Sequence, residues 1–425
     1  MSLGRCPSSS TNCNCGRAAR ATDLSPSSDT PKGRHGVVIS PWLPTPAKPF
    51  AGTFVVDFAK SLAEAYGSAP LLVHLDDAFR TRTPFLTELA TKALTRSRAR
   101  KISARSGASL TVPIPVTDGA GWLERMDMAM RIGPSIKALL RSTGSSQSPP
   151  DVHAHLGIMS GSLALNAVGR NRVFVYEHSA FALELIEADE RAHKIYAQVM
   201  SMAAGVLPVN EHLATRIRNL FPEHANKVRV HPNSIDVRRF AFRDRKPPLT
   251  KLLYIGNLKP EKGTRRLVDA LRKIRGSYED VTLAVAGQGP DVGYLKENAH
   301  RDNITVLPPV PPNEVPSLLH EFDMLLHLSE AETFGLTSIE AVLTGMPVLV
   351  SETDGSNAVI RPIEHESGTI VDQPAGPTEV FEAYEELRGS PGRLDLHSAR
   401  RHLEDAYDIR QVGRRLADLM ETSAG

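Results

Sequence analysis

Residues 323–350, DMLLHLSEAETFGLTSIEAVLTGMPVLV, show how this chain is built. A short apolar run at 323–328 leads into a turn with Gly335, then into an amphipathic stretch, and then into a second apolar run at 347–350. Apolar runs that alternate with helical stretches in this way are typical of buried strands in a parallel sheet. The segment therefore predicts a strand, a turn at the ligand-binding edge of the sheet, a helix and a further strand.

The same alternation extends through most of the chain. On the C-terminal side it predicts one set of strands, at 251–255, 281–286, 304–307, 323–328, 347–350 and 368–371. On the N-terminal side it predicts another set, at 36–40, 70–75, 110–114, 172–176, 205–209 and 228–231. The sequence thus predicts an α/β fold with two Rossmann-like doubly wound parallel-sheet domains that face each other across a cleft.

A charged segment with two prolines separates the two sets of strands. Pro247-Pro248 can continue neither a helix nor a central strand, so 241–250 is the predicted linker. We expect a disordered leader at 1–34, one domain at 35–240, a second at 251–400, and a C-terminal helix at 401–425 that packs back toward the first domain. A length of 425 residues also favours two domains over one.

Composition excludes several classes of function. The net charge is +2, so nothing in the bulk composition calls for a nucleic acid partner. All three cysteines lie within the first fifteen residues, at Cys6, Cys13 and Cys15, which leaves the predicted domains without disulfides and favours a reducing cytoplasm. The leader has no apolar run that would make it a secretory signal, and no stretch of the chain is apolar over the roughly 18 residues that a membrane span needs.

Two glutamates bracket the turn of the opening segment. Glu332 precedes Phe334-Gly335, and Glu340 follows eight residues after Glu332, about two helical turns into the expected helix. Gly335 would let the backbone approach a ligand, and the amides of Leu336 and Thr337 would open a helix whose N-terminus can hold a phosphate. Taken alone, the pair could equally be two solvated glutamates beside a packed turn.

The segment resembles the paired-glutamate motif of retaining glycosyltransferases of family four, which share the GT-B fold, and the resemblance extends from about residue 36 to the C-terminal helix. It implies transfer of a hexose-type sugar from a nucleotide-diphosphate sugar, with UDP as the expected nucleotide, to a hydroxyl of a glycan, glycolipid or small molecule. The first domain would bind the acceptor and the second the donor. Glu332 would orient the sugar and Glu340 would hold the ribose, with no cofactor and no metal.

Two further motifs of the second domain resemble donor loops of this family. IGNLKPEKG at 255–263 has Lys262 where a lysine holds the diphosphate, but Asn257 stands where the family has an arginine. Lys259 and Arg265 are the candidates to replace that charge. AGQGP at 286–290 brings Gly287 and Gly289 toward the nucleotide, whereas Gly293 comes one place too late for the G-x-G-x-x-G of a dinucleotide site.

The first domain carries the remaining motifs of the resemblance. SPWLPTPAKPFAGTFVVDFAKSLAEAYG at 40–67 supplies Gly52, which would lie against the donor phosphate or the reacting sugar. YEHS at 176–179 supplies His178, which takes the position of a histidine near that sugar. In DVHAHLG at 151–157, His153 and His155 are equally well explained as core histidines or as site residues. The resemblance thus predicts His178, Lys262 and Glu332 as the catalytic group.

The resemblance implies front-face attack, in which the departing phosphate oxygen deprotonates the acceptor hydroxyl. Three other functions stay open: a GT-B sugar phosphorylase, a nucleotide-sugar epimerase, and a non-catalytic donor-binding partner of another transferase, which the loss of the arginine at Asn257 would fit. The stretch 85–101, FLTELATKALTRSRARK, predicts a helix with a basic end. Such a helix could hold the protein at the inner face of an anionic membrane, or it could simply be solvated.

Overall fold

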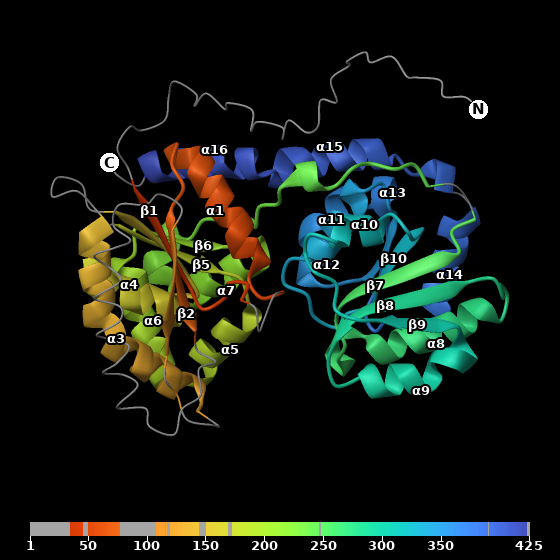
Figure 1. Cartoon of the computed structure of the whole chain (residues 1–425), viewed down its shortest axis with the longest axis horizontal. Coiled ribbons are helices and arrows are strands. Elements are labelled where there is room, and N and C mark those ends of the chain that lie inside the picture. Colours follow the sequence, from red (N-terminus) through yellow and green to blue (C-terminus); the bar gives the residue numbers. More distant parts are fainter. Residues whose placement is uncertain are drawn as a thin grey trace, which may run out of the picture.

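The computed structural model describes residues 35–45, 50–76, 108–114, 116, 120–143, 150–168, 172–245, 248–389 and 391–422. The expected leader at 1–34, its three cysteines and the basic stretch at 85–101 lie outside these residues. The described chain forms two lobes that lie side by side, with the N-terminal sheet in one and the C-terminal sheet in the other (Figure 1).

The first lobe is built on a six-stranded parallel sheet with the order β3-β2-β1-β4-β5-β6. Its strands are β1 Gly36–Ser40, β2 Leu71–Asp76, β3 Ser109–Pro113, β4 Asp151–His155, β5 Val173–Glu177 and β6 Gly205–Pro208. Its helices are α1 Thr53–Tyr66, α3 Trp122–Thr143, α4 Ser162–Val168, α5 Ala180–Ala188, α6 Glu190–Met202 and α7 Glu211–Leu220, with a π-helical turn, η1, at Gly157–Gly161.

The second lobe has a six-stranded parallel sheet with the order β12-β11-β10-β7-β8-β9. Its strands are β7 Lys251–Asn257, β8 Thr282–Gln288, β9 Ile304–Leu307, β10 Met324–His327, β11 Val348–Ser351 and β12 Gly368–Val371. Its helices are α8 Thr264–Arg275, α9 Val292–Asp302, α10 Val315–Leu319, α11 Leu336–Leu343, α12 Asp354–Val359, α13 Glu364–Ser367 and α14 Pro377–Gly389.

Each sheet reverses its direction of winding once, between β1 and β4 in the first lobe and between β7 and β10 in the second. Crevices for ligands open at the carboxyl ends of the strands at such switch points. The structure therefore confirms the predicted pair of Rossmann-like doubly wound domains. It also shows which strand ends frame a site: Ser40 and His155 in the first lobe, and Asn257 and His327 in the second.

One predicted strand of the first lobe is wrong. Residues 228–231 make only an isolated bridge between Val228 and Val206, with Pro232 directly after the stretch. The backbone amides of Arg229 and His231 do bond to carbonyl groups of β6, so the stretch lies beside that strand without extending the sheet. The sixth strand is β4, whose sequence DVHAH has the alternating polar residues that obscured it. All five of its residues are buried.

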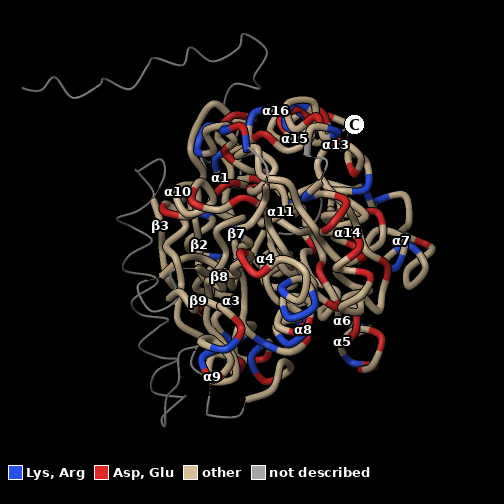
Figure 2. Tube along the Cα trace, turned by 90° about the vertical axis from the view of Figure 1, so that its right-hand side faces the viewer, with Lys and Arg blue, Asp and Glu red and all other residues tan. Residues whose placement is uncertain are grey.

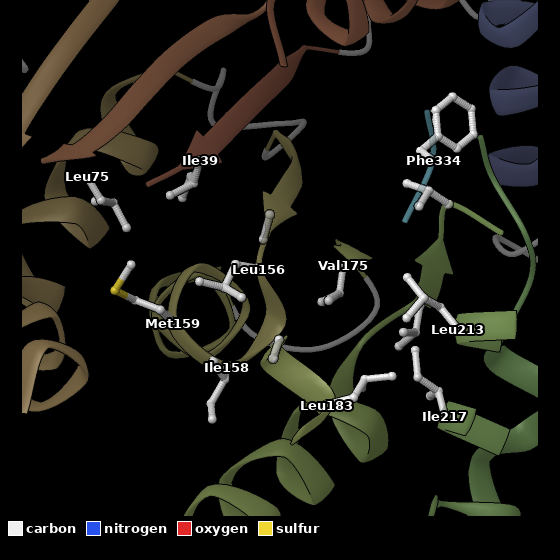
Figure 3. Packing of buried hydrophobic residues seen from close by; sticks show 14 of the residues in the cluster. Ile39, Leu75, Leu156, Ile158, Met159, Val175, Leu183, Leu213, Ile217 and Phe334 are labelled. Atoms are coloured by element: carbon white, nitrogen blue, oxygen red, sulfur yellow. The ribbon is translucent and has the colours of Figure 1, made fainter. Parts of the chain in front are cut away.

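The core of the first lobe forms where the sheet meets its helices. Ile39, Leu75 and Leu156 are almost fully buried and belong to one cluster with Met159 of the π-helical turn. Figure 3 shows these side chains turning toward one another from β1, β2 and the segment after β4. The same cluster extends to Phe334 in the second lobe, so apolar packing continues from one lobe to the other.

The C-terminal residues form two helices, α15 Leu396–Tyr407 and α16 Ile409–Thr422, where the sequence suggested one at 401–425. They run along one side of both lobes (Figure 1), and α16 packs on α1 of the first lobe. Gly413 permits this close approach, because a Cβ atom there would lie 2.5 Å from the carbonyl oxygen of Ser61. The end of the chain therefore joins the two lobes.

Candidate active site

A pocket of about 220 Å³ lies between the two lobes. The first lobe contributes Phe54, His178 and Asn233 to its lining. The second lobe contributes His327 and the turn and first helical residues after β10, namely Glu332, Thr333, Phe334, Gly335, Leu336, Thr337 and Ser338. The pocket thus lies at the carboxyl ends of strands from both sheets.

Lys262 and Glu332 form an ion pair beside this pocket. The Lys262 Nζ atom lies 2.9 Å from Oε2 of Glu332 and also donates a hydrogen bond of 2.8 Å to the carbonyl oxygen of Ala331. Gly263, directly after the lysine, lets this loop lie close to the end of β10, since a Cβ atom there would lie 1.8 Å from the carbonyl oxygen of Leu328. Burial alone would raise the pKa of Glu332, but the charges of Lys262 and His327 outweigh it and lower that pKa.

His327 was not predicted from the sequence as a site residue. It ends β10, lines the pocket and stacks on Tyr254, with ring centroids 5.1 Å apart. Burial lowers its pKa, and the carboxylate of Glu332 acts in the opposite direction. Its place at the end of a strand next to the switch point, five residues before Glu332, was the signal that could have identified it.

The turn at Gly335 opens α11 toward the pocket. Gly335 has φ of 80°, a left-handed conformation that favours glycine, and a Cβ atom there would meet no atom closer than 3.5 Å. Glycine is therefore needed at this position for its left-handed backbone conformation, and not because neighbouring atoms leave no room for a side chain. Leu336 and Thr337 follow it in the first turn and line the pocket. An eight-residue helix thus presents its N-terminus to a ligand at this place.

Phe334 and Glu340 are directed partly away from the pocket. The ring of Phe334 packs at 84° against Tyr407 of α15, with centroids 5.5 Å apart, so its side chain is mostly used in packing. Glu340 lies little more than one turn into α11, not two as expected, because the helix begins only at Leu336. Burial and the negative charge of Asp57 raise the pKa of its half-buried carboxyl group to about 7, and the positive charge of Arg239 acts in the opposite direction.

Close packing of two strands explains the two glycines at the end of β8, Gly287 within the strand and Gly289 directly after it. A Cβ atom at Gly287 would lie 1.9 Å from the carbonyl oxygen of Gly256, and one at Gly289 would lie 2.2 Å from that of Leu258. They allow the ends of β7 and β8 to lie close together. Neither glycine lines the pocket.

Asn257 ends β7 with an exposed side chain. Both candidates to replace the missing arginine have acidic partners: Lys259 lies 2.7 Å from Glu261, and Arg265 lies 3.7 Å from Asp291. Neither of these cations belongs to the pocket lining. Lys262 does not line the pocket either, but its ion pair with Glu332 and its hydrogen bond to Ala331 make it the cation of this loop that reaches the Glu332 turn.

Aromatic side chains of the first lobe surround His178. Its ring lies 4.5 Å from that of Phe54 and 6.1 Å from that of Trp42. Gly52, with φ of 67°, shapes this region, because a Cβ atom there would lie 2.4 Å from the carbonyl oxygen of Trp42. Gly52 itself is buried and does not line the pocket.

His178 is the outermost member of a group of buried histidines. Its Nε2 atom lies 2.7 Å from Nδ1 of His155, and the two rings stack 4.9 Å apart. Burial lowers the pKa of His178 to about 3, with hydrogen bonding to Asn233 acting in the opposite direction, and lowers that of His155 well below its usual range. Both rings are therefore neutral near pH 7, and His155 supports His178 from behind.

His153 belongs to the core. Its Nε2 and Nδ1 atoms each lie 2.9 Å from a tyrosine hydroxyl, that of Tyr66 and that of Tyr176 respectively. The ring is fully buried, which lowers its pKa to about 3. Of the two histidines left open by the sequence, His155 thus contacts a residue of the pocket and His153 does not.

The described residues contain no group of three or more His, Cys, Asp or Glu side chains arranged to hold a metal ion. Within the same part of the chain, no helix is both long enough and apolar enough to cross a membrane.

The second lobe is similar in sequence to a known family. Residues 238–391, which contain the Lys262 loop and the Glu332 turn, match a family model. That family is the glycosyl transferases group 1. The match covers the second sheet and its helices as far as η6 at Pro391–Arg393. The first lobe lies outside it.

A curated relative extends the likeness beyond the family match. The chain is 26% identical over 267 residues to a glycogen synthase of Mycobacterium tuberculosis (strain CDC 1551 / Oshkosh). The aligned part is 57% of this chain and 62% of the relative, so the chain spans less than two thirds of that protein.

Solved structures share the two-lobed fold. HepE of Anabaena in complex with UDP and glucose has a TM-score of 0.64 at 14% identity, covering 92% of this chain and 100% of HepE. Sucrose-phosphate synthase of Thermosynechococcus elongatus has a TM-score of 0.67 at 16% identity, covering 92% and 99%. At these identities the likeness establishes the GT-B fold.

Proposed function

We propose that this protein is a retaining glycosyltransferase that moves a hexose-type sugar from a nucleotide-diphosphate sugar to an acceptor hydroxyl. The observation that carries the proposal is the Lys262–Glu332 ion pair at the N-terminus of α11, which faces His178 across the pocket between the lobes. Cationic, amide and carboxylate groups are thus gathered where a diphosphate and its sugar would meet. The match of residues 238–391 to glycosyl transferases group 1 supports the same function.

The proposed roles follow from position. Lys262 and the first amides of α11 stabilise the departing diphosphate, and Glu332 accepts hydrogen bonds from sugar hydroxyls while it keeps Lys262 in place. Glu340 holds the ribose, and neutral His178 contacts the sugar from the first lobe. The departing phosphate oxygen takes the proton of the acceptor hydroxyl, so the mechanism uses neither a protein nucleophile nor a metal. UDP is the proposed nucleotide, as a structural neighbour contains UDP and glucose.

The acceptor is proposed to be a glycan, a glycolipid or a small molecule, and not a nucleic acid. Among the residues that the structure describes, Figure 2 shows Lys and Arg interspersed with Asp and Glu along the trace, without the stripe of one sign that nucleic acid binding favours. We propose a cytoplasmic protein. Contact with an anionic membrane through 85–101 remains a prediction on residues outside the described structure.

The deciding experiment is a screen of the purified protein against UDP-, GDP-, ADP- and dTDP-sugars. Thermal shift measures donor binding, and release of free nucleotide measures turnover. We expect one donor to stabilise the protein and to be slowly hydrolysed, with hydrolysis lost in Glu332→Gln. Glu330→Gln is the matched control, because Glu330 pairs with Arg266 outside the pocket. The anomeric configuration of the product, followed by NMR, then tests retention.

Asn257 supports a second candidate, a donor-binding protein without transfer activity. The arginine of the family motif is absent, and Lys259 and Arg265 have acidic partners. Stabilisation by a nucleotide sugar, with neither hydrolysis nor transfer to any acceptor, would favour this candidate. Phosphorolysis of a glycan without nucleotide would instead indicate a phosphorylase, and epimerised donor would indicate an epimerase.

A further inference from the structure

An aromatic pair lies at the start of two helices of the first lobe. Trp122 begins α3, and Phe181 is the second residue of α5. Their ring centroids are 5.7 Å apart at an interplanar angle of 44°. Trp122 also packs against the large core cluster, so the pair is anchored on one side.

The exposure of Phe181 is unusual for the described part of the chain. Phe181 is 49% exposed, and the other large apolar side chain with comparable exposure is Val230 at 38%. A single exposed apolar residue needs no explanation. An exposed ring packed on an anchored tryptophan is different, because it offers a rigid apolar face to a ligand at little cost in side-chain entropy.

The position of the pair relates it to the reaction. α5 begins directly after His178, which lines the pocket, and Ser179 caps the helix by accepting a hydrogen bond from the Phe181 amide. Three residues span at most about 10 Å of extended chain, so the Cα atoms of His178 and Phe181 lie no farther apart than that. Figure 1 shows α5 on the side of the first lobe nearer to the second. The backbone of Phe181 therefore lies within about 10 Å, the reach of one or two sugar residues, of a residue that lines the pocket.

We propose that Trp122 and Phe181 form an acceptor platform, on which a carbohydrate ring of the acceptor stacks while its hydroxyl group reaches the pocket beside His178. The C–H bonds on the apolar face of a sugar carry partial positive charge and interact with the electron-rich face of an aromatic ring. Sites for such ligands combine aromatic walls with a few polar groups, and here Asn233 and His178 line the adjoining pocket. This inference rests on the proposed function, since it names the class of its acceptor.

The chain contains two tryptophans, Trp42 and Trp122, which makes the platform directly observable. In Trp42→Phe, Trp122 is the single tryptophan left, and its fluorescence reports binding at the pair. We expect short oligosaccharides of glucose, mannose, galactose or N-acetylglucosamine to change this fluorescence in the absence of any donor. Phe181→Ala should weaken the apparent affinity of the responding sugar about three- to tenfold. Val230→Ala, which changes the other exposed apolar side chain, should leave it unchanged.

Two conservative variants separate stacking from general apolar contact. Phe181→Tyr keeps a ring and should bind the sugar normally, whereas Phe181→Leu keeps apolar area without a ring and should bind as weakly as Phe181→Ala. The platform is overturned if octyl chains or anionic phospholipid vesicles change the fluorescence while none of the sugars does. Equal sugar binding by Phe181→Leu and the parent protein would also overturn it.

A donor assay distinguishes failure of this inference from failure of the proposed function. In the full-length protein, Phe181→Ala should keep the donor-induced thermal shift and donor hydrolysis, and should raise only the KM for a sugar acceptor. If donor hydrolysis falls instead, Phe181 acts on the donor side and the platform is wrong. If the parent protein binds no nucleotide sugar, the proposed function fails, while the fluorescence response to sugars still tests the platform.

Discussion

Lys262 and Glu332 are 70 residues apart in the sequence, yet the Lys262 Nζ atom lies 2.9 Å from a carboxylate oxygen of Glu332. The lysine comes from the 3-10 turn after β7, and the glutamate comes from the loop after β10. These two strands are neighbours at the switch point of the second sheet, which brings their loops together. The ion pair thus joins two sequence motifs into one site.

Removing either partner of this pair should abolish most transfer and spare the fold. We expect Lys262→Ala and Glu332→Gln each to reduce kcat/KM by about two to three orders of magnitude. The first change removes the cation at the leaving diphosphate, and the second removes the carboxylate that holds the sugar hydroxyls and keeps Lys262 in place. Steady-state kinetics with the donor found in the screen measure the effect, and circular dichroism checks the fold. Lys273→Ala is the control, since Lys273 lies over Phe381 in a different part of the lobe. A variant with near-normal rates would remove that residue from the site.

Gly335→Ala should lower stability through backbone strain alone. A Cβ atom at Gly335 meets no close neighbour, so the expected cost is the left-handed φ of 80°, about 1–2 kcal/mol. Gly293→Ala is the matched control, because nothing lies near a Cβ atom there and the site is in a helix. Chemical denaturation should show the control as stable as the parent protein or slightly more so. Equal stability of the two variants would contradict the strain argument.

Glu340 should make folding stability fall as pH rises toward 7. Its folded-state pKa of about 7 is above the ordinary value, so between about pH 4.5 and 7 the folded protein holds a proton that the unfolded chain has released. As the pH rises through this range, the free energy of unfolding therefore falls, because the folded protein must give up this proton. In Glu340→Gln this loss is absent. The melting temperature of the variant relative to the parent should therefore be higher at pH 8 than at pH 5, and a constant difference would show that Glu340 does not titrate in this range.

His155→Leu should destabilise the first lobe and disturb His178. It removes the hydrogen-bond partner of a buried ring nitrogen, which costs about 1–3 kcal/mol. Urea unfolding measures this cost against His300→Leu, an exposed change in α9.

The pH dependence of kcat/KM in the parent protein should show no ionisation of His178 between pH 5 and 8, because burial lowers the pKa of its ring to about 3. A break in that profile that disappears in His178→Gln would contradict this assignment.

Much of the fold could be predicted from local pattern. Eleven of the twelve strands in the described part of the chain were anticipated within two residues at each end, because buried parallel strands are continuous apolar runs. β4 was missed because Asp151, His153 and His155 interrupt its apolar pattern, and their burial depends on partners elsewhere, such as Tyr66, Tyr176 and His178. The stretch 228–231 has a strand-like sequence but lies beside β6 without a full ladder.

The sequence by itself determined the two-domain α/β architecture, the strand-to-turn-to-helix units and the glycine at the start of α11, since each depends on residues near one another in the chain. Only the tertiary structure decided which of these residues meet. The order of the strands brings Lys262 to Glu332 and places His155 behind His178. It also sets β7 close beside β8, which is why glycine is needed at positions 287 and 289. It also places Trp122 against Phe181, 59 residues further along. Such contacts depend on how the chain crosses between strands, and no local period of a sequence contains that information.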